Sequence, residues 1–128
     1  MEKKYNVIGI YSRINEIITE IFKENEDISF DKDLFGITDG KFIIRVDFFI
    51  EDANVSGKFF ECAINSFSNK YELFMELTED GKEDIKCFNN SDEFLDGIEA
   101  YIKSPFVTYI FEEGTEISNY NKSLKHNE

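Results

Sequence analysis

Apolar residues near the start of the chain recur every three or four positions, and charged residues occupy the positions between them. The stripe consists of Val7, Tyr11, Ile14, Ile18 and Ile21. Because an α-helix has 3.6 residues per turn, this spacing places the apolar side chains on one face of a helix. The pattern predicts an amphipathic helix over about residues 5–24, ended by the charged stretch 24–27.

Farther along, apolar and polar residues alternate, which is typical of strands with one buried face. The expected inward positions are Phe42, Ile44, Val46, Phe48 and Ile50, then Phe60, Cys62 and Ile64, then Tyr71, Leu73, Met75 and Leu77. Asp39-Gly40 is a strong signal for a two-residue hairpin turn. Such a turn adds a preceding strand and pairs Ile37 with Phe42 and Phe35 with Ile44.

A second turn is predicted at Glu79-Asp80-Gly81. A three-residue loop with Gly81 in the left-handed conformation sets Ile85 opposite Met75 and Cys87 opposite Leu73. A two-residue loop would set Ile85 opposite Glu76, which mismatches the faces of the two strands. The three-residue loop is therefore the preferred prediction.

The last part of the chain predicts a helix and then a polar tail. Asn90 and Glu93 form a capping-box-like pair, and the buried stripe is expected at Phe94, Leu95, Ile98, Tyr101 and Ile102. Ser104-Pro105 should break or kink this helix. Residues 105–113 suit either an edge strand or a short helix. Beyond Gly114 the chain is polar, and residues 114–128 are expected to fray.

These elements predict one α+β domain over residues 1–113. Its parts are an N-terminal helix, a four- to five-stranded antiparallel meander sheet and a C-terminal helix packed with the first on one face. The chain has 128 residues, of which 41% are hydrophobic, and this is enough to build a core without disulfides or structural metals.

The charge of the chain limits its expected partners. It has 27 acidic and 14 basic residues, a net charge of −13, and a pI of about 4.4. Such a surface repels phosphate backbones and anionic lipids, so no direct nucleic-acid or membrane binding is expected. A basic protein partner is favoured for the same reason, although negative charge also serves solubility alone.

The residue types also bear on compartment and cofactors. The N-terminal residues lack the pattern of a signal peptide or membrane span, so a cytoplasmic location in a bacterium or a phage-infected host cell is expected. Cys62 and Cys87 are expected to be reduced, buried residues. The single histidine, His126, lies in the predicted tail, where it has no support for nucleophilic catalysis or zinc binding. No catalytic residue, metal or cofactor is predicted.

Two metal-dependent alternatives are weak. Residues 31–42 resemble an EF-hand loop at Asp31, Asp33, Gly36 and Asp39, but Phe35 and Phe42 stand where oxygen ligands belong. Asp84-Ile85-Lys86 has the acid-x-Lys form of the PD-(D/E)XK nucleases, with Glu76 or Asp47 as a further carboxylate for Mg²⁺. This short pattern is common by chance, so nuclease activity remains a remote alternative.

The acidity is concentrated in one part of the chain. Between Glu72 and Glu99, ten acidic and two basic residues give a net charge of −8. Within the predicted second helix, Asp92, Asp96 and Glu99 share one face, opposite the apolar stripe. Because no Lys or Arg follows until Lys103, this row repels itself, which favours a role in contacting a cationic partner.

The outward face of the predicted sheet is the second candidate surface. Strict alternation places large apolar groups there among carboxylates. The partner-binding set predicted on the sheet is Asp47, Phe49, Phe59, Glu61, Glu72, Phe74 and Glu76. Exposed aromatic groups inside a charged rim are typical of protein interfaces. The alternative is that the segment after Pro105 folds over this face and covers part of it.

In size, acidity and lack of catalytic groups, the chain resembles bacterial toxin-immunity proteins and phage inhibitors of host defence, including anti-CRISPR proteins. That resemblance implies a non-enzymatic inhibitor, monomeric or homodimeric, that blocks a basic toxin, nuclease or CRISPR effector by nucleic-acid mimicry. An alternative is a small acidic secretion chaperone or adaptor that binds an extended segment along an apolar surface.

Overall fold

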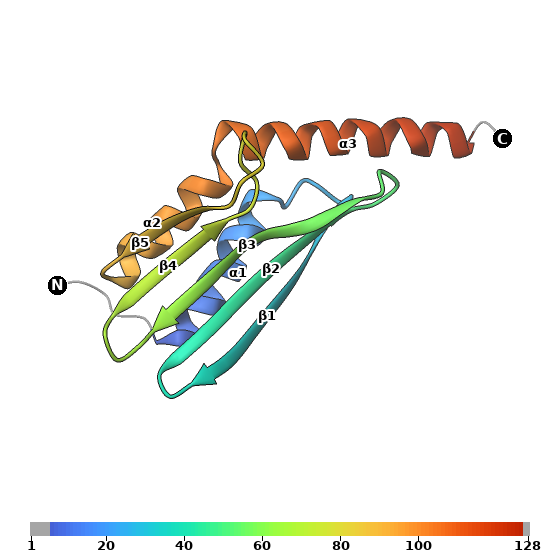
Figure 1. The fold of residues 1–128 in the computed structure, drawn as a ribbon. Coiled ribbons are helices and arrows are strands. Elements are labelled where there is room, and N and C mark those ends of the chain that lie inside the picture. Colours follow the sequence, from blue (N-terminus) through green and yellow to red (C-terminus); the bar gives the residue numbers. More distant parts are fainter. Residues whose placement is uncertain (1–5, 127–128) are drawn as a thin grey trace.

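The computed structural model describes residues 6–126 and shows an α+β fold (Figure 1). Its elements in chain order are α1 (Val7–Ile21), β1 (Ile28–Thr38), β2 (Lys41–Ile50), β3 (Val55–Asn65), β4 (Lys70–Met75), β5 (Asp84–Phe88), α2 (Ser91–Ile102) and α3 (Pro105–His126). The predicted fold class is confirmed: an N-terminal helix, an antiparallel sheet and C-terminal helices.

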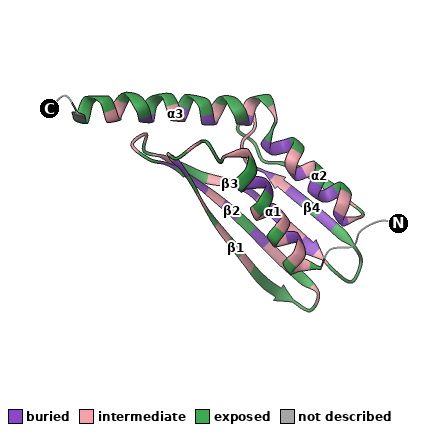
Figure 2. Cartoon of the chain, turned by 180° about the vertical axis from the view of Figure 1, so that it is seen from behind, coloured by how far each residue is buried: buried purple, intermediate pink, exposed green. Residues whose placement is uncertain are grey.

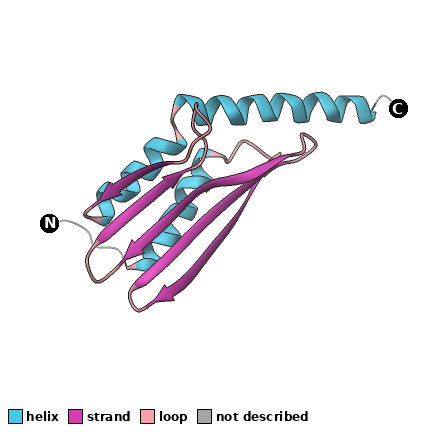
Figure 3. Cartoon of the chain, in the orientation of Figure 1, coloured by secondary structure: helices cyan, strands magenta, loops and turns pink. Residues whose placement is uncertain are grey.

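The five strands form a meander in which each strand pairs only with its neighbours in sequence, in the order β1-β2-β3-β4-β5. Helices α1 and α2 lie behind the sheet in the view of Figures 1 and 3, on the same face. The buried residues gather between these helices and the sheet (Figure 2). The other face of the sheet, here called the outer face, has no helix over it.

The two predicted helices on the inner face are confirmed, with slightly shorter bounds for the first. Asn6 caps α1 by accepting a hydrogen bond from the Gly9 amide at 2.7 Å. Asn90 caps α2 in the same way, accepting from the Glu93 amide at 2.8 Å. These bonds satisfy amides that have no partner inside the helix, which explains where both helices begin.

The register of the first hairpin differs from the prediction. The turn at Asp39-Gly40 is present, with Thr38 opposite Lys41, but a bulge at Ile37 then shifts the strands by one residue. Leu34 rather than Phe35 therefore lies opposite Ile44, and Phe35 and Ile37 are exposed. An extra residue in one strand moves every side chain before it to the opposite face of the sheet. The alternation of apolar and polar residues does not reveal such a bulge.

A second bulge places Phe59 in the core, so the prediction of an outward, partner-binding Phe59 is wrong. Phe60 lies opposite Val46 and Lys58 lies opposite Asp47, which leaves Phe59 unpaired between them. Both Phe59 and Phe60 have 0% exposure. The bulge turns two consecutive side chains inward and moves Lys58 onto the outer face.

The predicted register of the last hairpin, between β4 and β5, is also wrong. Gly81 does adopt the left-handed conformation, with φ of 74°. Ile85, however, lies opposite Phe74, and Cys87 lies opposite Glu72, one position away from the predicted pairing. Both side chains therefore point to the outer face, and Cys87 is exposed rather than buried. Cys62 is buried as predicted, and burial raises the pKa of its thiol.

Residues 105–126 form a helix, which settles the choice left open for residues 105–113 and corrects the expected fraying of residues 114–126. The last two residues of the predicted tail, 127 and 128, lie outside the described part of the chain. The helix starts at Pro105, where a missing amide hydrogen costs nothing. Its first half packs through Val107 and Phe111, and its second half is held at the β2–β3 turn. There Asn121 donates to the Asp52 carbonyl at 2.6 Å, and Lys125 pairs with the Asp52 carboxylate.

The hydroxyl of Tyr101 supports the bulge at Phe59. It donates to the Phe59 carbonyl at 2.7 Å and accepts from the Leu77 amide at 3.0 Å. Burial raises the pKa of this phenol, so it stays protonated and can make both bonds. The Phe59 carbonyl also accepts from the Glu76 amide at 3.3 Å, so the hydroxyl supplies its second and shorter hydrogen bond and gives the Leu77 amide a partner.

We predict that Tyr101→Phe destabilises the fold by about 1–3 kcal/mol, because it leaves the Leu77 amide without its partner and removes the shorter of two hydrogen bonds to the Phe59 carbonyl. Urea denaturation followed by circular dichroism measures the change. The control is Tyr109→Phe, since Tyr109 is an exposed residue of α3 and should tolerate the same loss of a hydroxyl. Equal stability of Tyr101→Phe and the wild type would show that the hydroxyl does not support the bulge.

Candidate functional site

The outer face of the sheet is the candidate functional site. Side chains reach it from all five strands, because alternate residues of each strand point away from the helices. Its carboxylates are Asp31, Asp33, Asp47, Glu61, Glu72 and Glu76. Its bases are Lys41, Arg45, Lys58 and Lys70, which leaves the carboxylates in excess. Its larger apolar groups are Phe35, Ile43, Phe49, Phe74 and Ile85.

The apolar groups of the outer face are accessible. Phe49 on β2 is 45% exposed and Ile85 on β5 is 49% exposed. Ile43 on β2 and Phe74 on β4 are partly buried. The expected alternative, in which the segment after Pro105 covers this face, is not seen: α3 runs across one end of the sheet (Figure 1).

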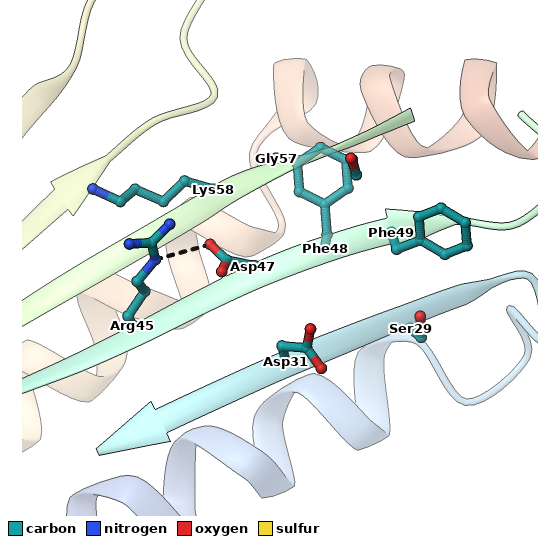
Figure 4. A pocket seen from close by; sticks show the side chains of 9 residues that line it. Ser29, Asp31, Arg45, Asp47, Phe48, Phe49, Gly57 and Lys58 are labelled. Carbon is teal, nitrogen blue, oxygen red and sulfur yellow. Dashed lines mark hydrogen bonds and ion pairs between the residues drawn. The ribbon is translucent and has the colours of Figure 1, made fainter. Parts of the chain in front are cut away.

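A shallow hollow of about 400 Å³ lies on the outer face over β1, β2 and β3 (Figure 4). Asp31 and Asp47 face each other across it as register partners, and Lys58 is the partner of Asp47 on the other side. Arg45 donates to Asp47 at 3.2 Å. Phe49 closes the hollow toward the β2–β3 turn.

Not every carboxylate of this face has a cation beside it. Lys58 lies 3.8 Å from Glu61 and 3.7 Å from Glu76, so one ammonium serves two acids. Asp31 and Glu72 take part in no side-chain hydrogen bond or ion pair within residues 6–126. Like charges directly opposite each other, as at Asp31 and Asp47, destabilise a sheet. The face therefore carries negative charge that the fold itself does not use.

Glu76 shows the effect of this crowding. A hydrogen bond with the Glu83 carboxyl raises the pKa of Glu76, and partial burial and the charge of Glu83 act in the same direction. Lys58 lowers the pKa but does not outweigh these effects. The neighbouring carboxyl group thus favours the protonated form of Glu76.

The ten predicted partner-binding residues are divided by the structure. Six of them lie on the outer face: Asp47, Phe49, Glu61, Glu72, Phe74 and Glu76. Phe59 is buried in the core. Asp92, Asp96 and Glu99 lie on the side of α2 that points away from the sheet, and Glu99 pairs with Lys103 at 3.7 Å. Because α2 covers the inner face, these three residues belong to a different surface.

Sequence reasoning missed several residues of the outer face. Lys58 joins it because of the bulge at Phe59, and Asp31 and Asp33 join it because of the bulge at Ile37. Ile85 joins it through the shifted register of β5. Only the pairing of strands reveals these positions, since each depends on a one-residue shift.

The edges of the sheet oppose the addition of another strand. Lys32 of β1 lies opposite Val46, and Lys86 of β5 lies opposite Leu73, so both edge strands carry a lysine on the inward side. A charged residue that points inward on an edge strand is a known obstacle to pairing between chains. The Lys32 carbonyl also accepts from the Tyr11 hydroxyl at 2.9 Å. These features favour recognition through the outer face over recognition through an edge.

The metal-dependent alternatives find no assembled site in the described part of the chain. Asp84 and Lys86 share the inward side of β5, whereas Glu76 and Asp47 lie on the outer face, and Asp47 is three strands away. The EF-hand-like residues 31–42 form a β-hairpin. Within residues 6–126, no group of three or more His, Cys, Asp or Glu side chains is placed to hold a metal ion.

Comparisons with known proteins add no family assignment. No protein-family model, no curated protein and no solved structure matches this chain. The class of the protein therefore rests on its architecture, an α+β fold whose antiparallel sheet has one helix-covered face and one open face. Across residues 6–126, none of the helices is both long enough and apolar enough to cross a bilayer.

We predict that Glu83→Gln stabilises the protein at neutral pH by about 0.5 kcal/mol, a size typical of partly exposed charge pairs. Because the folded-state pKa of Glu76 is raised, its contact with Glu83 stabilises the fold at low pH and becomes repulsive as pH rises through that pKa. The gain from Glu83→Gln should therefore be present at pH of about 7 and vanish near pH of about 4.

Melting temperatures measured across this pH range test the prediction. Glu79→Gln is the matched control, since it removes one exposed carboxylate from the same loop without touching Glu76. A gain that stays constant with pH, or one that Glu79→Gln reproduces, would mean that net charge rather than the Glu76–Glu83 pair is responsible.

Proposed function

We propose that the protein is a non-enzymatic binding protein that uses the outer face of its sheet to block a basic protein partner. The observation that carries the proposal is the open outer face, where accessible apolar side chains lie among six carboxylates, of which Asp31 and Glu72 have no ion pair within residues 6–126. A stable fold gains nothing from uncompensated charge placed beside exposed apolar groups. A partner rich in Lys and Arg would supply the missing cations.

The chemistry of the face favours a protein partner over other classes. Phe49 and Ile85 offer apolar anchors, and the surrounding carboxylates offer a rim that excludes nucleic acid and anionic lipid. Complementary charge mainly accelerates association and selects the partner, while the desolvated apolar anchors contribute most of the affinity. A toxin, nuclease or CRISPR effector with a basic nucleic-acid groove fits this description.

Cytoplasmic inhibition of such a target, in a bacterium or an infected host cell, is the biological form of the proposal. Carboxylates spaced along neighbouring strands would occupy cationic positions that otherwise bind phosphates. Inhibition would then follow from exclusion of the nucleic acid, without any chemical step performed by this chain.

A secretion chaperone or adaptor is the second candidate, favoured by the apolar side chains of Ile43, Phe49 and Phe74, which lie among the charged residues of the outer face. An extended segment of another protein would lie along these groups. Binding of this kind depends on apolar contacts, so it should persist in high salt, whereas binding through uncompensated carboxylates should weaken.

We predict that reversing two charges on the outer face lowers affinity for a basic target at least roughly tenfold, a loss expected when interface charges become repulsive. The variant is Asp31→Lys with Glu72→Lys, because neither residue has an ion pair to lose. Biolayer interferometry against a panel of purified basic nucleases and CRISPR effector nucleases measures the affinity at low and high salt.

The matched control is Asp96→Lys with Glu99→Lys on α2, which changes the net charge by the same amount on the other side of the molecule. It should retain nearly wild-type affinity. Equal losses in the two variants would mean that net charge alone drives binding. Unchanged affinity of the outer-face variant for a target that binds the wild type would remove the outer face as the site.

A further inference from the structure

Helix α3 carries two apolar stripes, and only one of them packs against the rest of the chain. The packed stripe contains Val107, Phe111, Gly114 and Ser118, all buried. The second stripe, here called the free stripe, contains Phe106, Ile110, Ile117, Tyr120 and Leu124. At 100° per residue, the free stripe is centred roughly 100° around the helix from the packed one.

The free stripe is accessible over the C-terminal half of α3. Ile117 is 43% exposed, Tyr120 is 64% exposed and Leu124 is 47% exposed. This half of the helix passes the β2–β3 turn and extends beyond the sheet (Figure 1). Three large apolar side chains in a row on one exposed helix face exceed what a solvated surface needs.

The spacing of the free stripe is that of a helix–helix contact. Its members follow one another at steps of four and three residues, with Glu113 at the one polar position: Phe106, Ile110, Glu113, Ile117, Tyr120 and Leu124. Alternating steps of three and four define the heptad seam through which two helices pack. A second helix with the same spacing is therefore a natural occupant of the free stripe.

Charge favours another copy of α3 as that second helix. Residues 105–126 contain three acidic and two basic residues, a net charge of −1, within a chain whose net charge is −13. Two copies of this acidic protein therefore repel each other least where α3 meets α3. A basic partner, by contrast, has little to gain from so nearly neutral a helix.

We propose that the free stripe is the contact surface of an antiparallel α3–α3 homodimer with its two-fold axis near Ile117. In a parallel pair, the Glu113 side chains of the two copies would face each other within the apolar seam. In the antiparallel pair they lie about 12 Å apart along the helix axis. The helix dipoles also oppose each other favourably in this arrangement.

This dimer is independent of the proposed function, because the free stripe and the outer face share no residue. The partner-binding variant Asp31→Lys with Glu72→Lys should leave the oligomeric state unchanged. Loss of the dimer and loss of partner binding are thus separable results.

The first test is sedimentation velocity of the full chain across a wide range of concentration. The wild type should shift from monomer toward dimer as concentration rises, and Ile117→Asp should remain monomeric. Ile8→Asp is the matched control, because Ile8 is a 69% exposed isoleucine on α1 and its substitution should leave the dimer intact. A wild type that stays monomeric throughout overturns the proposal and leaves the free stripe to a different protein.

The second test determines the orientation of the helices by disulfide formation. In a Cys87→Ser background, which removes the exposed native thiol, a single cysteine is introduced as Ile117→Cys or Leu124→Cys. The antiparallel dimer links readily through position 117 and not through position 124, whose copies lie about 21 Å apart along the axis. Efficient linkage through position 124 would show a parallel pair and overturn the antiparallel arrangement.

Discussion

The packing of Phe59 is the interaction on which the other parts of the structure depend. Its ring lies within about 6.4 Å of rings from every layer of the core: Phe22, Phe30, Phe48, Phe60, Tyr101 and Phe111. Those residues come from the end of α1, from three strands and from both C-terminal helices. Aromatic pairs at these distances and angles contribute beyond the area that they bury.

Hydrogen bonds at the bulge offset the backbone cost of placing Phe59 inward. A bulge removes one residue from the regular ladder, and a buried carbonyl without a partner would cost as much as a lost hydrogen bond. The Tyr101 hydroxyl and the Glu76 amide both donate to that carbonyl, and the bond from Tyr101 also fixes α2 against β3. The extra residue in β3 thereby links the packing of the sheet with that of α2, and through the ring of Phe59 with that of Phe111 on α3.

The same bulge shapes the outer face. With Phe59 turned inward, Lys58 lies outward between Glu61 and Glu76 and supplies the one ammonium in that part of the face. The remaining carboxylates lie among apolar side chains that no element covers. The packing of the core and the electrostatics of the proposed binding surface are thus two consequences of one irregularity in β3.

The two proposed contact surfaces differ in charge and in apolar character, as their different partners require. The outer face is acidic and suits a cationic partner, whereas the free stripe of α3 is apolar and nearly neutral and suits a second copy. An acidic protein that is to bind a basic target and also associate with itself needs such a separation, because the charge that attracts the first partner repels the second.

Local patterns in the sequence were sufficient for the fold class. The 3.6-residue period of α1 and α2, the cap at Asn90, the turn at Asp39-Gly40 and the left-handed Gly81 all depend on residues close together in the chain. Six of the predicted outer-face residues also followed from alternation, because alternation holds wherever the ladder is regular. The sequence left open whether the segment after Pro105 covers this face, and the course of α3 across one end of the sheet decided it.

Only the tertiary structure revealed the one-residue shifts in strand register and the long-range packing. The bulges at Ile37 and Phe59 and the register of β5 reverse which side chains face outward. At Phe59 the bulge is supported by a hydrogen bond from Tyr101, a residue far away in sequence. Likewise, residues 114–126 are polar enough to suggest a tail, yet Asp27 and Asp52, distant in the chain, pair with Lys122 and Lys125 and hold them in a helix. The sequence pattern indicates the local conformation that a segment prefers, but it does not indicate which distant residues that segment will contact.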